Sequence, residues 1–226
     1  MESGGAVLRR REHGKLDKRR RIGEAARAAF TECGYKGANM REIAKRAGVA
    51  TGTLFLYAPD KRSLLLWMVH DDLERLTEET FADGAAAVRA HDDLLEQLLC
   101  VFETRYRYWG ADRELAMIAL QELTTKRGQS MAGPHLAHYD DRQYVVREHL
   151  TELVRAQQAR GRIRPSADPD AVAQLVFAIY NASIRSWLRS DEVPLAGGLT
   201  ELRKLLRLAL EGCAGPIGRG AGGTSN

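Results

Sequence analysis

The segment 39–61, NMREIAKRAGVATGTLFLYAPDK, constrains the fold of this chain more than any other stretch. Four apolar residues in its first half recur at the i, i+3, i+4 and i+7 positions of a helix: Met40, Ile43, Ala44 and Ala47. Gly48 follows where the chain turns, and glycine adopts a positive φ without steric cost. A second short helix can begin at Ala50 or Thr51. The pattern therefore predicts two short helices joined by a tight turn, which is the helix-turn-helix arrangement used to bind DNA.

The second of these short helices has small, polar and apolar side chains on its outward face. Helical spacing directs Leu54 and Tyr57 inward. Five residues remain on the outward face: Thr51, Gly52, Thr53, Phe55 and Leu56. Hydroxyl groups and a glycine allow close approach to the floor of the major groove, and an apolar side chain can contact a thymine methyl group. We therefore expect these five residues to face the bases of a DNA site.

Helices are also expected on both sides of this segment. From residue 16 to residue 33 the apolar side chains repeat at helical spacing, and Gly34 follows in a position where glycine commonly ends a helix. Pro59 and Asp60 are typical of the start of a further helix. Three helices and the start of a fourth fit into this stretch. We therefore expect a helix-turn-helix DNA-binding domain over residues 16–62.

The segment from Arg20 to Leu66 resembles the N-terminal domain of the TetR family of transcriptional regulators. The residues that carry the resemblance are spread over all four helices: Ala26, Phe30, Gly34, Tyr35, Ile43, Ala44, Ala47, Gly48, Val49, Gly52, Thr53, Leu54, Tyr57, Lys61 and Leu64. The chain differs from the family pattern where Ala50 replaces a frequent capping Ser. The resemblance implies a homodimer on a near-palindromic operator in double-stranded DNA, with a C-terminal domain that senses a small-molecule effector. In such a complex we expect four residues to hold phosphates: Tyr35, Asn39, Tyr57 and Lys61.

The charge of the chain is distributed unevenly. Residues 1–62 hold 15 Lys or Arg against 7 Asp or Glu, a net charge of +8, whereas the remainder has a net charge of −4. Because DNA binding neutralises phosphates, this asymmetry supports a DNA interface near the N-terminus, although a modest basic excess also occurs on ordinary solvated surfaces. Residues 1–15 are basic and poor in apolar side chains, so we expect a disordered arm there. The Gly-rich residues 214–226 predict a flexible tail.

Residues 63–213 are expected to form a second helical domain. Turn signals predict a helix at about 61–81 and five further helices, near 91–109, 112–127, 134–160, 168–190 and 199–212. No strand-like alternation occurs, so the predicted fold is all-α with about nine helices, a DNA-binding domain followed by a ligand-binding and dimerisation domain. The last two helices carry small residues and a leucine-rich side. We expect them to form a four-helix dimer interface, with ordinary core packing as the alternative.

An effector pocket needs apolar walls and a few polar anchors. The candidates are aromatic, polarizable and amide side chains in the middle helices: Phe102, Tyr106, Trp109, Met117, Gln121, Tyr144, Phe177, Tyr180 and Asn181. The same spacing of aromatic residues is also typical of plain core packing. The pattern leaves the chemical class of the effector open.

The sequence contains no motif for catalysis or metal binding. GxSxG, P-loop and HExxH patterns do not occur, and His135 and His138 lack a third ligand at fixed spacing. Cys33, Cys100 and Cys213 are far apart and are expected to be structural. The longest apolar runs are too short to span a bilayer, and no secretion signal is present. We therefore expect a cytoplasmic protein without catalytic activity, cofactor, metal or membrane contact.

Together these features predict a ligand-responsive regulator, most simply a repressor that a small molecule releases from a palindromic operator. Two alternatives belong to other classes. One is an enzyme or carrier for a small molecule that retains a vestigial helix-turn-helix. The other is a helical partner-binding protein that has no ligand. Only a regulator is expected to combine salt-dependent operator binding with a ligand response.

Overall fold

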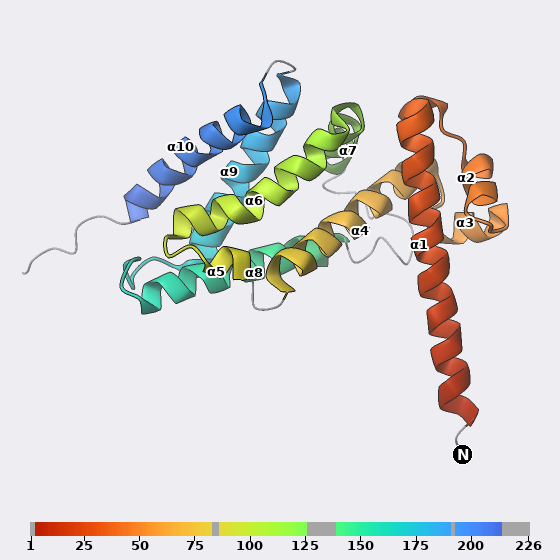
Figure 1. The fold of residues 1–226 in the computed structure, drawn as a ribbon, viewed down its shortest axis with the longest axis horizontal. Helices are drawn as coiled ribbons and strands as arrows, with labels where there is room; N and C mark the ends of the chain where they lie inside the picture. Colours follow the sequence, from red (N-terminus) through yellow and green to blue (C-terminus); the bar gives the residue numbers. More distant parts are fainter. Residues whose placement is uncertain (1–2, 83–85, 126–138, 191–192, 214–226) are drawn as a thin grey trace, which may run out of the picture. The chain divides into compact units, whose positions relative to one another are not determined.

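The computed structural model describes residues 3–82, 86–125, 139–190 and 193–213, apart from the side chains of residues 3–13, 123–125, 139–144 and 213. Over these residues the chain forms ten helices and no strand (Figure 1). The helices are α1 (Ser3–Gly37), α2 (Met40–Arg46), α3 (Thr51–Tyr57), α4 (Lys61–Phe81), α5 (Ala86–Arg89), α6 (Leu94–Ala111), α7 (Arg113–Thr125), α8 (Tyr139–Ala159), α9 (Pro169–Arg189) and α10 (Leu195–Cys213). The predicted all-α class is confirmed.

The helices group into two compact units. The first unit comprises Met1–Arg75 and Trp109–Arg142, and the second comprises Leu76–Tyr108 and Gln143–Asn226. This grouping differs from the predicted linear division into residues 16–62 and 63–213. The difference arises because α7 packs against α1 and because Nη2 of Arg62 in α4 donates a hydrogen bond to the carbonyl oxygen of Glu122 at 2.9 Å.

The first unit is built around the apolar face of α1. Its large and fully buried side chains come from the first four helices: Ile22, Phe30, Ile43, Leu54, Leu64, Leu65 and Leu66. Removing each such side chain from water stabilises the fold by roughly 1.5–3 kcal/mol. α2 packs on α1, and α3 packs on α2 (Figure 1). α4 begins where the sequence predicts, because Oδ1 of Asp60 accepts a hydrogen bond from the Ser63 amide at 2.6 Å and satisfies a free donor of the first turn.

α1 is longer than the sequence predicts. Residues 3–15, for which we expect a disordered arm, continue the helix as far as Ser3. This stretch follows a helical segment that the core already fixes, so each further residue adds a hydrogen bond without a new nucleation cost. At the other end of the segment the predicted break is present, since Gly34 has a φ of 66° and a ψ of 166°.

The second unit has its core between α6, α8, α9 and α10. Large buried side chains from these helices include Leu98, Phe102, Leu150, Val154, Val176, Tyr180, Ile184, Leu202 and Leu206. α9 begins where the sequence predicts. Asp168 caps it by accepting a hydrogen bond from the Asp170 amide at 3.1 Å, and Pro169 occupies the first turn, where the lack of an N–H costs nothing.

α10 begins at Leu195, earlier than the predicted start at residue 199. Gly197 and Gly198 have low helix propensity, which is why the sequence favours a later start. Gly198 lies against the indole of Trp187, and a Cβ placed on Gly198 would come within 2.6 Å of the indole Cδ1. Trp187 is itself held by a hydrogen bond from Nε1 to the carbonyl oxygen of Val193 at 2.9 Å. The close packing of α9 on α10 thus requires glycine at position 198.

The structure tests only part of the remaining predictions on metal binding, cysteines and membrane segments. His135 and His138 lie outside the described residues, as does the tail predicted at 214–226. Among the side chains that are described, no group of three or more could hold a metal ion. Cys33 and Cys100 are free thiols. None of the helices in the described part is both long and apolar enough to cross a lipid bilayer.

Candidate functional site

The turn between α2 and α3 has the geometry that the sequence predicts. Asn39 caps α2, because its Oδ1 accepts a hydrogen bond from the Arg41 amide at 2.8 Å. Gly48 has a φ of 64°, a conformation that is costly for residues with a Cβ. The Val49 amide donates to the carbonyl oxygen of Ala44 at 3.0 Å. The chain therefore reverses within a few residues, and α3 follows directly.

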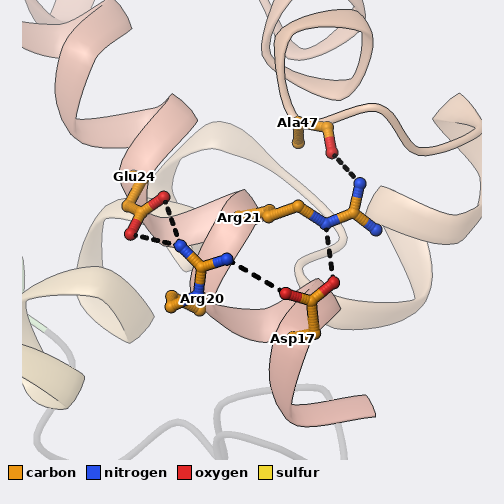
Figure 2. A network of polar contacts seen from close by, with 5 residues as sticks. All are labelled: Asp17, Arg20, Arg21, Glu24 and Ala47. Atoms are coloured by element: carbon orange, nitrogen blue, oxygen red, sulfur yellow. Dashed lines mark hydrogen bonds and ion pairs between the residues drawn. The ribbon is translucent and has the colours of Figure 1, made fainter. Parts of the chain in front are cut away.

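An arginine of α1 holds this turn in place. Nη1 of Arg21 donates a hydrogen bond to the carbonyl oxygen of Ala47 at 3.0 Å (Figure 2). The same guanidinium forms an ion pair through Nε with Oδ2 of Asp17 at 3.1 Å. Arg20 binds both Asp17 and Glu24, and its hydrogen bond lowers the pKa of the Asp17 carboxyl. Because the last carbonyls of a helix lack intrahelical partners, Arg21 satisfies one of them and ties the turn to α1.

α3 presents its predicted outward face to solvent. The five residues expected to face bases are all at least partly accessible: Gly52, Phe55 and Leu56 are exposed, and Thr51 and Thr53 are half-buried. Leu54 is fully buried, whereas Phe55 is 44% exposed and Leu56 is 75% exposed. Leu56 has the largest exposed fraction of any large apolar side chain in the described part of the chain. No side chain caps α3 at Ala50, as the replacement of Ser implies.

Lys61, which we expect to contact a phosphate, is already engaged within the protein. Its Nζ donates hydrogen bonds to the carbonyl oxygens of Lys36 at 2.9 Å and Ala38 at 3.0 Å. It also lies 5.1 Å from the ring centroid of Tyr35. Two of the three ammonium donors are therefore used, which leaves one for a phosphate. Burial raises the pKa of the Tyr35 phenol, so this hydroxyl stays a neutral donor.

The other two residues expected at phosphates differ in accessibility. Asn39 is exposed, and its Oδ1 serves the cap of α2. Tyr57 is half-buried at the end of α3, with its ring centroid 6.1 Å from that of Trp67 in α4. All four phosphate contacts remain predictions.

Five aromatic side chains come together in the core of the second unit. The ring of Tyr180 stacks on that of Phe102, with centroids 4.6 Å apart and 5° between the planes. The Tyr106 ring lies 6.2 Å from Tyr180 and 5.0 Å from Trp187, and the Phe177 ring lies 5.8 Å from Tyr180. We call Phe102, Tyr106, Phe177, Tyr180 and Trp187 the aromatic cluster. It joins α6 to α9.

Polar side chains are buried beside this cluster. Arg105 is only 5% exposed, and its Nη2 donates a hydrogen bond to Oγ1 of Thr77 at 2.5 Å. The hydroxyl groups of Tyr106 and Ser183 are buried, lie close to each other, and bond to no other group among the described residues. Burial lowers the pKa of the Arg105 guanidinium and raises the pKa of the Tyr106 phenol. We call Thr77, Arg105, Tyr106 and Ser183 the buried donor cluster.

A hollow of about 440 Å³ lies elsewhere on the second unit. It is lined by Glu148, His149, Thr151, Glu152, Arg155 and Asp170. Three carboxylates share this hollow with Arg155, which pairs with Glu152 at 3.3 Å and with Asp170 at 3.6 Å. Asp170 also accepts a hydrogen bond from Thr151 at 2.9 Å. None of the six lining residues has an apolar side chain, so this hollow is a poor candidate for the predicted effector pocket.

The helix-turn-helix also carries a family signature in its sequence. Residues 22–68 match the family described as "Bacterial regulatory proteins, tetR family". Residues 22–68 thus form a DNA-binding domain of the TetR family. The match spans the core of α1, the turn between α2 and α3, and the start of α4, so the resemblance found in the sequence is confirmed.

Regulators of similar sequence and of similar structure match both units of the chain. The "Fatty acid metabolism regulator protein" of Bacillus subtilis is 24% identical over 194 residues, which cover 83% of this chain and 94% of the relative. Thermus thermophilus FadR, a TetR-family repressor solved with lauroyl-CoA, has a TM-score of 0.67 and 24% identity over 91% of this chain and 100% of its own. Bacillus subtilis FadR, solved with stearoyl-CoA, has a TM-score of 0.64 and 21% identity over 85% and 97%. The TetR-family fold thus extends well beyond the helix-turn-helix.

The core of the second unit brings together only some of the residues predicted to bind the effector. Four of them belong to the aromatic cluster: Phe102, Tyr106, Phe177 and Tyr180. Asn181 follows on α9, where its Nδ2 donates to the carbonyl oxygen of Phe177 at 2.9 Å. Three others lie in the first unit: Trp109, Met117 and Gln121. The side chain of Tyr144 lies outside the described ones.

Sequence periodicity does not identify five residues that the structure places at the two sites: Arg21, Thr77, Arg105, Ser183 and Trp187. Arg105 does give a signal, because it follows Phe102 by three residues on the buried face of a helix, where arginine is unusual. Arg21 gives a weaker one, since Asp17 four residues earlier is placed to pair with it. The others depend on which helices are neighbours, which periodicity alone does not specify.

Proposed function

We propose that the protein is a homodimeric repressor that binds a near-palindromic operator and is released from it by a fatty acyl effector. In this proposal α3 reads bases, α9 and α10 form the dimer interface, and the aromatic cluster contacts the acyl chain of the effector. The observation that carries the proposal is the solvent-exposed face of α3 on a helix-turn-helix of the TetR family.

The reading role of α3 is supported by what its exposed side chains can contact. Leu56 and Phe55 project into solvent beside the hydroxyl of Thr53. In a major groove an apolar side chain can cover a thymine methyl group, and a Thr hydroxyl can bond to a base edge. The net charge of +8 over residues 1–62 favours contact between this N-terminal region and the phosphate backbone of DNA.

A dimer through α9 and α10 is supported by apolar residues on their outward faces. On α9, Leu175 is 45% exposed and lies among small exposed residues at helical spacing: Ala171, Ala178 and Ala182. On α10, Leu205 is 37% exposed and Leu208 is 67% exposed. Small residues let two helices approach closely, and an isologous dimer covers the same patch on both subunits. A second copy of the chain would therefore bury these leucines.

The effector class is supported by the similar structures and by the core of the second unit. Two of the similar proteins were solved with acyl-CoA molecules, lauroyl-CoA and stearoyl-CoA. The aromatic cluster offers the apolar surface that an acyl chain needs. A ligand shifts an equilibrium only by its difference in affinity for the two states. The effector must therefore bind the free repressor more tightly than the operator-bound repressor.

The reading role is tested by selecting genomic fragments that bind the purified protein and measuring their affinity by fluorescence anisotropy. We expect Leu56→Ala to weaken operator binding about tenfold, because one good base contact contributes roughly 1–3 kcal/mol. The matched control is Leu16→Ala, which removes a leucine of α1 that is 62% exposed. We expect the control to bind as the wild type does. Unchanged affinity of the Leu56 variant would refute the assignment of α3.

The effector class is tested on the complex of wild-type protein with this operator. We expect lauroyl-CoA and stearoyl-CoA to release the DNA, and coenzyme A alone to leave it bound. Failure of every acyl-CoA would remove the fatty acyl class and leave the DNA-binding role intact. The proposal assigns the protein no reaction of its own, as is the case for its regulator relatives, and places it in the cytoplasm with the DNA.

A further inference from the structure

We propose that the buried donor cluster of Thr77, Arg105, Tyr106 and Ser183 binds the anionic end of the effector. The effector is then an acyl compound that carries a carboxylate or a phosphate beside its apolar chain. This inference rests on the proposed function, in which an acyl compound is the effector. The inference adds to that function the side chains of the protein that recognise the negative charge of the effector.

Arg105 brings a positive charge into the core of the second unit without a matching negative charge. It is 5% exposed, and arginine stays protonated even where burial lowers its pKa. Among the described residues no carboxylate pairs with it, and the acceptor it contacts is the neutral hydroxyl of Thr77 at 2.5 Å. Arg203 of the same unit shows the usual solution, since it is more exposed and still binds the Glu96 carboxylate at 2.8 Å. A buried charge without a counter-charge is unfavourable, so an anion at Arg105 would be stabilising.

Two further hydroxyl groups in the same core have no partner beyond each other. Those of Tyr106 and Ser183 are buried and lie close together, and neither bonds to another group within the described structure. Tyr106 follows Arg105 directly on α6, and its ring lies 6.2 Å from that of Tyr180. Most buried polar side-chain atoms in proteins have a hydrogen-bond partner. A buried guanidinium with one neutral partner, next in sequence to a tyrosine of this hydroxyl pair, therefore marks a site for a ligand.

The chemistry of the cluster selects the class of ligand. A guanidinium only donates hydrogen bonds, and the pair of Tyr106 and Ser183 hydroxyls keeps one donor available. Carboxylate and phosphate oxygens accept such bonds and also neutralise the charge, which makes the bonds stronger than those to a neutral carbonyl. The stacked rings of Phe102 and Tyr180 lie next to these donors and provide an apolar surface for the chain of the ligand. The site should therefore distinguish a charged acyl compound from a neutral ester of the same length.

Isothermal titration of the full-length protein with laurate, lauroyl-CoA and methyl laurate tests this distinction. We expect at least one of the two anionic compounds to bind ten times more tightly than the methyl ester. Tighter binding of laurate locates a carboxylate at the cluster, and tighter binding of lauroyl-CoA alone locates a phosphate. Equal affinity for the methyl ester, or no binding of any of the three compounds, would overturn the inference.

The role of Arg105 is tested with Arg105→Met and a matched control, Arg107→Met. Arg107 lies on the same helix, is exposed, and pairs with Glu103. We expect Arg105→Met to lose at least tenfold in affinity for the anionic compound and to lose the preference over methyl laurate, with no change for the control. We also expect the melting temperature without ligand to stay equal or rise, because an unpaired buried charge is removed. A lower melting temperature with an unchanged preference would show a merely structural role.

Ser183→Ala carries the test if Arg105→Met does not fold. This change removes one donor with little change in volume, so we expect affinity for the anionic compound to fall several-fold at an unchanged melting temperature. Unchanged affinity would contradict the inference. Operator binding is measured on the same preparations. If lauroyl-CoA releases the operator but Arg105→Met keeps its preference for the anion, the inference fails and the proposed function stands. If the operator is bound and none of the compounds binds, the acyl effector fails with it.

Discussion

Arg21 and Lys61 are two cations of the basic N-terminal region that donate hydrogen bonds to backbone carbonyls. Arg21 binds the carbonyl oxygen of Ala47, and Lys61 binds those of Lys36 and Ala38. Both therefore fix helix ends that position α3. At the scale of single residues, the net charge of a DNA-binding segment overestimates the number of its phosphate contacts, because some of its cations bind backbone carbonyls that position α3.

Arg21→Ala is expected to weaken operator binding more than it weakens the fold. The variant leaves the Ala47 carbonyl without its side-chain donor and releases the turn before α3, so we expect a loss of about tenfold in operator affinity, or roughly 1.4 kcal/mol. Fluorescence anisotropy on the operator measures this change. Arg20→Ala is the matched control, since it removes the same charge from the same turn of α1 without touching α2. Equal losses in the two variants would mean that only charge matters.

The sequence predicts the residues of the reading helix better than those of the effector site. Leu54 inward and Leu56 outward follow directly from helical periodicity, and the structure has both. The aromatic cluster depends on which helices are neighbours in the second unit. Trp109 has the same character as its members but lies in the first unit. Periodicity identifies a buried face, and it does not say which other face covers it.

At the scale of helices, the pair α9 and α10 shows where local propensity and packing disagree. The two glycines at 197 and 198 argue against a helix start, yet α10 begins at Leu195. Trp187 needs the space that a side chain at 198 would fill. α4 and α9 were predictable because Asp60 and Asp168 are local caps. Four-residue α5 carries too few residues to show a period.

Gly198→Ala is expected to lower the stability of the protein. The added Cβ would lie 2.6 Å from the Trp187 ring, and such overpacking costs roughly 1–3 kcal/mol in a well-packed core. Thermal unfolding followed by circular dichroism measures the loss. Gly212→Ala on the same helix has no neighbouring atom within 4 Å, so we expect its stability to be unchanged or higher by up to about 0.5 kcal/mol. A stable Gly198 variant would contradict the packing of α9 on α10.

At the scale of the whole molecule, α4 connects the two candidate sites through the chain itself. Its residue Trp67 lies near Tyr57 at the end of α3, and its residue Thr77 accepts the hydrogen bond of Arg105. The helix runs without interruption from Lys61 to Phe81. A response of the DNA reader to a ligand requires a physical connection of this kind.

Leu208→Glu is expected to convert the proposed dimer into monomers. A charge buried in the apolar interface proposed for α9 and α10 would lose its solvation, so analytical ultracentrifugation should report a halved mass. We expect operator affinity to fall by roughly 10²-fold or more, because two linked half-site contacts become independent. Thr200→Glu adds the same charge at another exposed position of α10 and is expected to leave the dimer intact. A dimeric Leu208 variant would place the interface elsewhere.

Gly198 leaves the indole of Trp187 packed between α10 and the ring of Tyr106, whose centroid is 5.0 Å away. The chain has three tryptophans, and Trp67 lies instead beside Tyr57, at the end of the reading helix. Each candidate site thus contains a tryptophan that lies close to another aromatic side chain and can serve as a native fluorophore. Variants that keep one indole at a time would let emission spectra follow DNA capture and effector entry as separate optical signals in the same unlabelled protein.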